Sequence, residues 1–334
     1  MKVLLTIGDH LTRIEMMHRD RVALVDESGE QTGSWGEITY ARLVELVRAQ
    51  AAGLDRLGVG RSEPVAVLTR SSARLLTSFL AISGTGRVLL PVDFRMSVQD
   101  IAGVIDHSGA TTVLVDPEYD NALFHGLAAQ HFVLGTASDA ELYRFGVETE
   151  PWDPDDDAIA ILEYANGAIA CTEPVALTHG DLRADLAAFG WQLDLSERDV
   201  YLHTVPLCHT RAWGLVYALT AMGGRHVAFD NMDGLEILRR IDAYGVTLVD
   251  GAPVFGMTVL GAAASWDGPV RGRDRLRVVL TGAPPPTTER LDTELGWELV
   301  HVDGLAKPSP VSTPRDRGTD DEMQPPAAGM AAGT

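Results

Sequence analysis

Short runs of β-branched and aliphatic residues alternate along this chain with segments of helical periodicity, and this alternation constrains the fold most strongly. The segment 40–57 repeats apolar residues such as Leu43 and Val47 at helical spacing, and Gly58 follows where a helix is expected to end. The apolar runs are 65–68, 88–92, 112–115, 159–162, 246–249 and 278–280. Near-continuous apolar strands separated by helices predict an α/β fold with mostly parallel sheets buried on both faces.

Composition narrows the classes of partner and compartment. The chain has 334 residues, of which 46% are hydrophobic, enough for one large domain or two smaller ones. The chain has 47 acidic and 27 basic residues, for a net charge of −20, so we expect neither nucleic acid nor an anionic membrane as a partner. The two cysteines, Cys171 and Cys208, exclude a disulfide framework and favour a reducing, cytoplasmic compartment. We expect no signal peptide and no membrane span, since no segment reaches about 20 apolar residues.

Two segments interrupt the alternating pattern. The segment 151–157 is rich in proline and aspartate and predicts a surface loop. From Ser312 onward the composition turns to Pro, Gly, Ala, Asp and Met without periodicity, which predicts a disordered tail over 312–334. We therefore expect residues 1–311 to form the folded part of the chain.

Three segments marked by glycine and proline follow apolar runs in the second half of the chain. Residues 164–179 read YANGAIACTEPVALTH, residues 206–215 read PLCHTRAWGL, and the third segment runs from LRVVLTGAP at 276 to DGLAKPSP, which ends at 310. With residues 20–26, 79–92 and 251–255, they stand in the order and spacing of one known family.

This arrangement resembles the large domain of the acyl-adenylate-forming ligases, which include acyl-CoA synthetases, peptide-synthetase adenylation domains and luciferase. The resemblance extends over about residues 10–311. It implies a remnant of that large domain, with two αβαβα-type sheet subdomains packed together. We expect it to lack the family's β-barrel lobe and its small C-terminal domain.

The first of the three segments departs from the family at the phosphate loop. The family reads Y-T-S-G-T-T-G-x-P-K-G there, and its hydroxyls, amides and lysine hold the phosphates of ATP. Tyr164 and Gly167 persist in this chain, but most hydroxyl positions are apolar and Glu173 stands at the lysine position. Two unit charges 4 Å apart interact by about 4 kcal/mol at an effective dielectric of 20, so reversing the sign strongly disfavours polyphosphate.

The third segment departs in the same direction. The family motif Y-G-x-T-E supplies a tyrosine packed on adenine and a glutamate for Mg²⁺, whereas this chain carries Asp303 and Lys307 at those two positions. We find no counterpart of the family's ribose-binding aspartate, hinge or C-terminal catalytic lysine. The resemblance therefore implies a degenerate, C-terminally truncated member that uses no ATP, and we expect no cofactor.

The acyl-binding side of the family site is better preserved. His209 matches a residue that lines the acyl pocket in the family, and the loop with Asp303 faces it there. An aspartate directed at a histidine fixes its tautomer and raises its basicity, so we predict His209 as general base and Asp303 as its orienter or a second acid–base group. The alternative leaves Asp303 solvated in an inactive site. Expected substrate-binding residues are Cys208, Trp213, Gly282, Ala283, Pro284, His301 and Gly304.

Other reactive side chains are given structural roles. Because neighbouring residues on a strand face opposite sides, Cys208 is expected to be a small buried hydrophobe, not a nucleophile paired with His209. His179 is expected to be structural, with Thr178 capping a helix. No His-x3-His or Cys-x2-Cys pair occurs, so no metal site is predicted.

These features predict a repurposed, ATP-independent enzyme of natural-product biosynthesis. It would act on an acyl or polyketide-type intermediate by cyclisation, dehydration or thioester cleavage. The alternative is a non-catalytic protein that binds an acyl ligand or scaffolds a biosynthetic partner, and a working ligase is the third reading. Besides the small-molecule substrate, a carrier protein is left open as a partner, and the missing lobes favour a homodimer.

Overall fold

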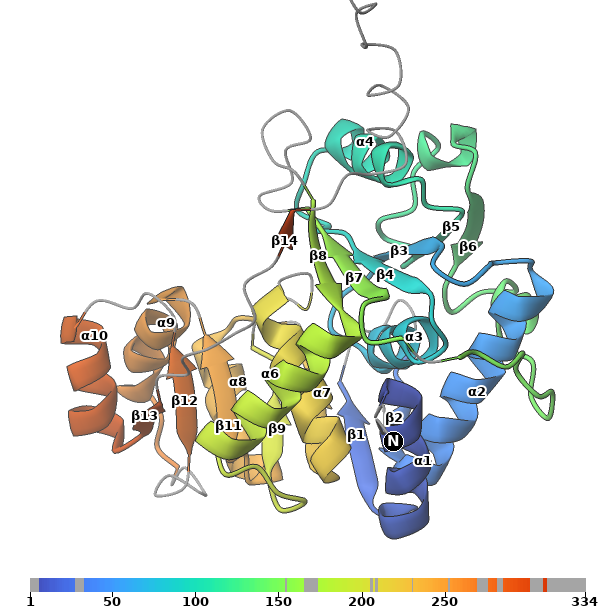
Figure 1. Cartoon of the computed structure of the whole chain (residues 1–334). Helices are drawn as coiled ribbons and strands as arrows, with labels where there is room; N and C mark the ends of the chain where they lie inside the picture. Colours follow the sequence, from blue (N-terminus) through green and yellow to red (C-terminus); the bar gives the residue numbers. More distant parts are fainter. Residues whose placement is uncertain are drawn as a thin grey trace, which may run out of the picture.

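The computed structural model describes residues 6–27, 33–153, 155–164, 174–204, 207, 210–229, 231–251, 253–268, 276–280, 285–300 and 309–310. These residues form two seven-stranded sheets with helices between and around them (Figure 1). The α/β fold predicted from the alternating pattern is confirmed. The predicted tail 312–334 lies outside the described residues.

The first sheet joins strands from both ends of the chain. Its order is β13-β12-β11-β9-β10-β1-β2. The strands are β1 (Val22–Asp26), β2 (Gly36–Thr39), β9 (Val200–Leu202), β10 (Arg225–Ala228), β11 (Leu248–Gly251), β12 (Arg277–Leu280) and β13 (Glu298–Val300). All neighbours are parallel except β1 and β2. Because β1 pairs with β10, the N-terminal region is built into the sheet of the second half.

The second sheet comes mainly from the first half of the chain. Its order is β14-β8-β7-β4-β3-β5-β6. The strands are β3 (Pro64–Leu68), β4 (Val88–Pro91), β5 (Thr112–Val115), β6 (Gln130–Val133), β7 (Ile159–Glu163), β8 (Val175–Thr178) and β14 (Ser309–Pro310). Here β8 is antiparallel to both of its neighbours, and the remaining pairs are parallel. Among the described strands, neither sheet closes into a barrel.

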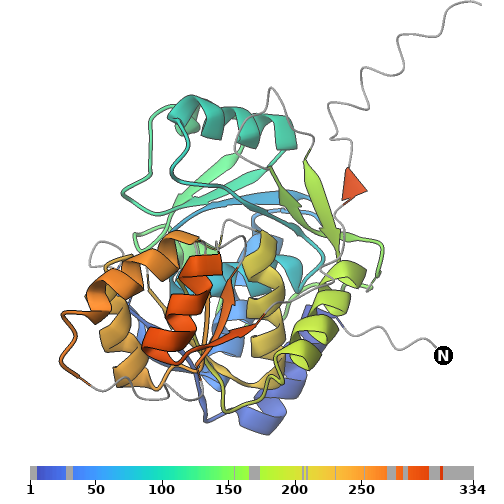
Figure 2. The same ribbon diagram turned by 90° about the vertical axis from the view of Figure 1, so that its left-hand side faces the viewer.

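Helices form three layers that alternate with the two sheets (Figure 2). The middle layer holds α1 (Ile7–His18), α2 (Tyr40–Arg56), α3 (Ala73–Ser83), α6 (His179–Gln192) and α7 (Thr210–Met222). The outer face of the first sheet is covered by α8 (Gly234–Tyr244), α9 (Pro253–Ala263) and α10 (Pro285–Arg290). Helix α10 continues into a π turn at Leu291–Leu295. The outer face of the second sheet is covered by α4 (Val98–Ser108). Two short elements, η1 (Phe124–Gly126) and α5 (Asp139–Leu142), complete the described part. The αβαβα layering implied by the resemblance is thus present.

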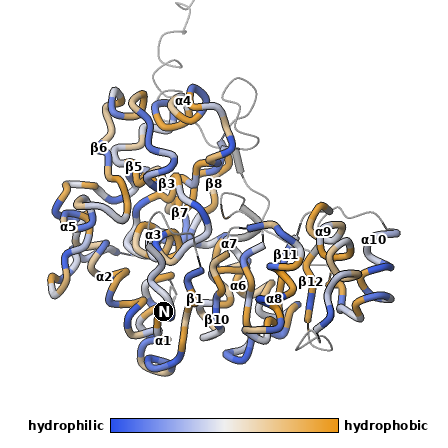
Figure 3. Tube along the Cα trace, turned by 180° about the vertical axis from the view of Figure 1, so that it is seen from behind, coloured by the Kyte–Doolittle hydropathy of each residue, from blue (hydrophilic) through white to orange (hydrophobic). Residues whose placement is uncertain are grey.

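Alternation along the strands explains why both sheets are covered twice. In β3, Val65 and Val67 belong to the buried cluster between the sheets, whereas Ala66 and Leu68 belong to the cluster under α4. Successive strand residues point to opposite faces, so a strand that is apolar at every position needs helices on both sides. The hydropathy colouring in Figure 3 follows these layers, with hydrophobic residues concentrated along the strands and α3.

Local signals set the element boundaries close to the predicted ones. The predicted helix 40–57 is α2, which Thr39 caps by accepting a hydrogen bond from the amide of Arg42. Gly58 ends it with a left-handed φ of +78°. In contrast, β11 begins at Leu248, later than the predicted run 246–249, because the amide of Val246 still closes the end of α8.

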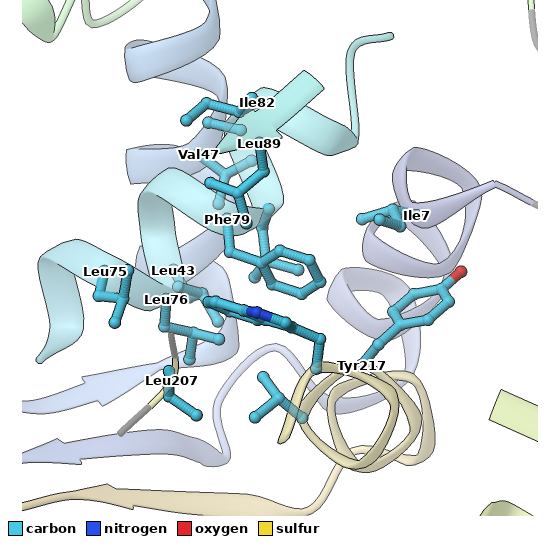
Figure 4. Close-up of a cluster of buried hydrophobic side chains, with 14 of the residues drawn as sticks. Ile7, Leu43, Val47, Leu75, Leu76, Phe79, Ile82, Leu89, Leu207 and Tyr217 are labelled. Carbon is cyan, nitrogen blue, oxygen red and sulfur yellow. The ribbon is translucent and has the colours of Figure 1, made fainter. Parts of the chain in front are cut away.

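The helix α3 packs at the centre of the layer between the two sheets. Every one of its 11 residues is buried. Phe79 lies against the indole of Trp213 from α7, with ring centroids 4.6 Å apart, and Figure 4 shows Leu75, Leu76, Phe79 and Leu207 in one cluster of buried side chains. Aromatic pairs of this kind add about 0.5–1.5 kcal/mol to the stability gained from buried area alone.

Close packing in the middle layer leads to a first prediction. A Cβ atom at Gly53 of α2 would lie 1.9 Å from the carbonyl oxygen of Leu142 in α5, so Gly53→Ala must force the two helices apart. Its free energy of unfolding should fall by about 1–3 kcal/mol in urea denaturation. Gly261 of α9 is the control, since no atom lies within 4 Å of its added Cβ, and Gly261→Ala should be neutral or stabilise by up to about 1 kcal/mol. Equal stability of the two variants would contradict this packing.

Candidate functional site

The chain order of the first sheet reverses at β9. From β9 the chain passes through α7 in the middle layer to β10, and then through α8 on the outer face to β11, on the other side of β9. Open α/β sheets bind ligands outside the carboxyl ends of the strands at such a reversal. The predicted site segments 206–215, 282–284 and 301–304 follow β9, β12 and β13, parallel strands whose carboxyl ends lie at the same edge of the sheet.

Most predicted site residues lie outside the described part of the chain. These are the predicted catalytic pair, His209 and Asp303, and the predicted substrate-binding residues Cys208, Gly282, Ala283, Pro284, His301 and Gly304. Their roles, including the pairing of His209 with Asp303, stay predictions.

Trp213 is the one predicted site residue that the structure describes. It lies in the first turn of α7, is fully buried, and packs on Phe79 of α3. No described group accepts a hydrogen bond from its Nε1 atom. Trp213 therefore serves the core between α7 and α3, and contact with a substrate stays a prediction.

A buried tyrosine–aspartate pair lies at the carboxyl ends of β9 and β11, and the sequence interpretation did not anticipate it. The Tyr201 hydroxyl donates to Oδ1 of Asp250 over 2.6 Å. Thr204, just beyond β9, donates its hydroxyl to the backbone carbonyl of Asp250. Burial raises the pKa of Asp250 to about 6, although the hydrogen bond from Tyr201 acts against this shift. A carboxyl group that titrates near neutrality thus lies at the reversal point of the sheet.

Two buried histidines, His203 and His226, lie on the same face of the sheet as Tyr201 and Asp250. These four residues are called the polar stripe below. Nε2 of His203 lies 3.0 Å from Nδ1 of His226, and Nε2 of His226 lies 3.0 Å from the Thr220 hydroxyl. That hydroxyl donates to the carbonyl of Val216, so it accepts from His226, whose Nδ1 then accepts from His203. Burial lowers the pKa of His226 to about 3 and that of His203 well below its ordinary value. Both rings are neutral near pH 7.

The tautomers follow from this chain of hydrogen bonds. His203 carries its proton on Nε2, which leaves the lone pair of Nδ1 without a partner among the described groups. Neither histidine follows a recognisable motif in the sequence, and only the parallel pairing of β9 with β10 brings Tyr201 beside His226. Sequence reasoning could not have found this contact without the register.

The structure describes the two ends of the segment that corresponds to the family's phosphate loop. Tyr164 is buried, and its hydroxyl lies 2.8 Å from Nδ1 of His107 in α4. After the loop, Thr178 caps α6 in a reciprocal arrangement with Asp181, as predicted. His179 is buried against Trp152 with ring centroids 4.8 Å apart, and burial lowers its pKa to about 4. Its predicted structural role agrees with these contacts.

Comparison with known proteins agrees with the layering and with the motif order. A family model described as AMP-binding enzyme matches residues 12–333. The chain belongs to this family. The acyl-adenylate-forming resemblance is therefore confirmed at the level of the family. Among the described helices, none is both long and apolar enough to cross a membrane.

Similar members of the AMP-binding family are CoA ligases by name. The chain is 28% identical to the 4-hydroxybutyrate–CoA ligase 2 of Metallosphaera sedula over 292 residues, which is 80% of this chain and 52% of that protein. It is 30% identical to the long-chain-fatty-acid–CoA ligase of Thermus thermophilus, covering 84% of this chain and 54% of that protein. The chain thus spans about half the length of these curated relatives.

Solved structures support the fold. A long-chain-fatty-acid–CoA ligase from Archaeoglobus fulgidus superposes with a TM-score of 0.78 at 18% identity, covering 89% of this chain and 61% of that one. An O-succinylbenzoate–CoA synthetase from Bacillus subtilis in complex with AMP gives a TM-score of 0.72 at 18% identity, covering 87% and 71%. The large-domain architecture of the AMP-binding family is therefore retained.

The buried carboxyl group of Asp250 predicts a pH dependence of stability. Its folded-state pKa of about 6 exceeds the ordinary 3.8, so the folded chain holds this proton more tightly than the unfolded chain. The resulting stabilisation is complete below the ordinary pKa and is lost as the pH rises through the folded-state pKa. Between about pH 5.5 and 7.5, the wild-type free energy of unfolding should fall by about 1 kcal/mol more than that of Asp250→Asn in urea titrations.

Asparagine keeps an acceptor for Tyr201 and cannot ionise, so it isolates the titration of Asp250. Asp153→Asn, at an exposed loop position, controls for the loss of one negative charge. Parallel pH curves for the wild type and Asp250→Asn would contradict the perturbed carboxyl group.

Proposed function

We propose that this chain binds an acyl or polyketide-type small molecule at the reversal point of the first sheet and acts on it without ATP. The observation that carries the proposal is the inverted charge of the former nucleotide site, with Glu173 at the lysine position and Lys307 at the glutamate position. The sign of both charges opposes triphosphate and Mg²⁺ binding. Relatives named as ligases of 4-hydroxybutyrate and long-chain fatty acids support an acyl substrate. A carrier protein and a second copy of the chain stay predicted partners.

The proposed chemistry is proton transfer by His209. As general base it would remove a proton from the substrate in a cyclisation or dehydration, or from water in a thioester cleavage, with Asp303 orienting the ring. Proton transfer of this kind contributes about 10²–10⁴-fold to a rate. The buried histidines of the described stripe are compatible with such chemistry, because burial lowers their pKa and they do not compete for the proton.

ATP-dependent CoA ligation is the second candidate. It is favoured by the names of the curated relatives, several of which are CoA ligases, and by the AMP complex of a structural neighbour. The two candidates differ in one measurable property, which is the affinity for Mg²⁺–ATP.

Nucleotide binding separates the two candidates. We expect no ATP–pyrophosphate exchange with a panel of carboxylic acids and no calorimetric binding of Mg²⁺–ATP. Glu173→Lys restores the cation of the loop, so it should raise the affinity for Mg²⁺–ATP. The control Glu148→Lys makes the same change of charge at an exposed position and should not. Tight Mg²⁺–ATP binding or exchange by the wild type would overturn the proposal in favour of ligation.

The role of His209 is tested by turnover of acyl and polyketide-type thioesters offered as N-acetylcysteamine conjugates. His209→Ala should lower kcat by at least about 100-fold, and Asp303→Asn should lower it less and move the acidic limb of the pH profile. Unchanged turnover in His209→Ala would exclude the general base. Wild-type binding of the thioesters without turnover would support the non-catalytic alternative instead.

A further inference from the structure

We propose that Asp120, His125 and His131 form a zinc-binding site on the edge of the second sheet, away from the acyl site. These three side chains come from three successive pieces of chain, namely the turn after β5, helix η1 and strand β6. The sequence interpretation predicted no metal site, because no His-x3-His or Cys-x2-Cys pair occurs, and these three residues stand five and six positions apart. The fold brings the three residues together.

The geometry of the cluster is close to that of a metal site. Nε2 of His125 lies 3.0 Å from Oδ1 of Asp120, and Nε2 of His131 lies 2.8 Å from the same oxygen. The three potential ligand atoms all lie within 4.8 Å of one another. Ligands at about 2.0–2.1 Å from a tetrahedral zinc ion are about 3.3 Å apart, so small side-chain movements admit the ion.

The strand-borne ligand is already fixed in place by packing. His131 pairs with Val113 in the β5–β6 ladder, and its side chain is only 9% exposed. Its ring centroid lies 6.4 Å from that of Phe124 and 4.2 Å from that of His125. His125 is half exposed, so the cluster opens to solvent on that side. A preformed site with an open side lets a metal enter without a rearrangement of the backbone.

The donor set indicates the class of metal. Two imidazoles and one carboxylate suit Zn²⁺, as in catalytic sites with two histidines and one acidic ligand, and they leave a fourth position for water. Mg²⁺ and Ca²⁺ prefer sites built from oxygen ligands alone. Ni²⁺ and Cu²⁺ compete for such nitrogen ligands, with Cu²⁺ the strongest of the series.

Binding would have a structural consequence at β6. This strand is the last in the order of its sheet and pairs with β5 alone among the described strands. A bound ion would connect β6 to η1 and to the turn after β5, so it would suppress opening of this edge. The stabilisation would increase with the free zinc concentration, as for any ligand that binds only the folded state.

Calorimetric titration of the full chain with Zn²⁺ tests the proposal. We expect one saturable site whose dissociation constant rises by more than about tenfold in His125→Ala and in Asp120→Asn. Asp120→Asn keeps an oxygen acceptor for both rings and removes the negative charge of the carboxylate ligand. Hydrogen exchange should become slower in β6 when zinc is added to the wild type, and should not change in His125→Ala.

The control separates this cluster from other ligands in the chain. His18→Gln changes a histidine on α1 outside the cluster and should leave the titration unchanged. Co²⁺ bound at the cluster should give visible d–d bands without thiolate charge-transfer absorption, which excludes Cys171 and Cys208 as ligands. An unchanged dissociation constant in His125→Ala, or no saturable binding by folded wild type, would overturn the proposal and leave a hydrogen-bonded surface cluster.

Discussion

The contact between α3 and α7 is the constraint on which the rest of the structure depends. Phe79 and Trp213 meet in the layer between the two sheets, and every residue of α3 is buried there. Since β1 and β2 belong to one sheet and β3 to the other, neither sheet can be completed without the chain crossing this layer. Helix α7 follows β9 directly in the order of described elements, so the core contact of Trp213 and the candidate site belong to neighbouring elements.

Much of this fold could be predicted from local signals, but those signals gave no prediction of which distant segments meet. The apolar runs, the caps at Thr39 and Thr178, and the left-handed Gly58 depend on residues within one or two turns. The pairing of β1 with β10 joins residues about 200 positions apart, and nothing in either strand specifies its partner. The motif resemblance supplied the layering, whereas the stripe of Tyr201 and His226 and the surface histidine cluster required the register and the turns.

Retention of the family fold and change of its nucleotide segments fit together physically. The core residues of the layers set stability, whereas the phosphate loop and the 303–307 segment lie in the connections between elements. Substitutions in connections can change binding without unfolding the layers, so a family architecture does not determine the reaction. The function must therefore be argued from the charges of the site and tested by nucleotide binding.

The buried stripe limits what the sheet itself can contribute to any reaction at this edge. Near pH 7, His203 and His226 are neutral because burial disfavours their charged forms, and Tyr201 stays protonated beside Asp250. Of the stripe residues, only Asp250 titrates near neutrality. A reaction that needs a mobile proton or a strong base must then obtain it from the segments that follow the strands, which include His209. The stripe residues are buried, and a buried setting strengthens the interaction of any charge placed beside them.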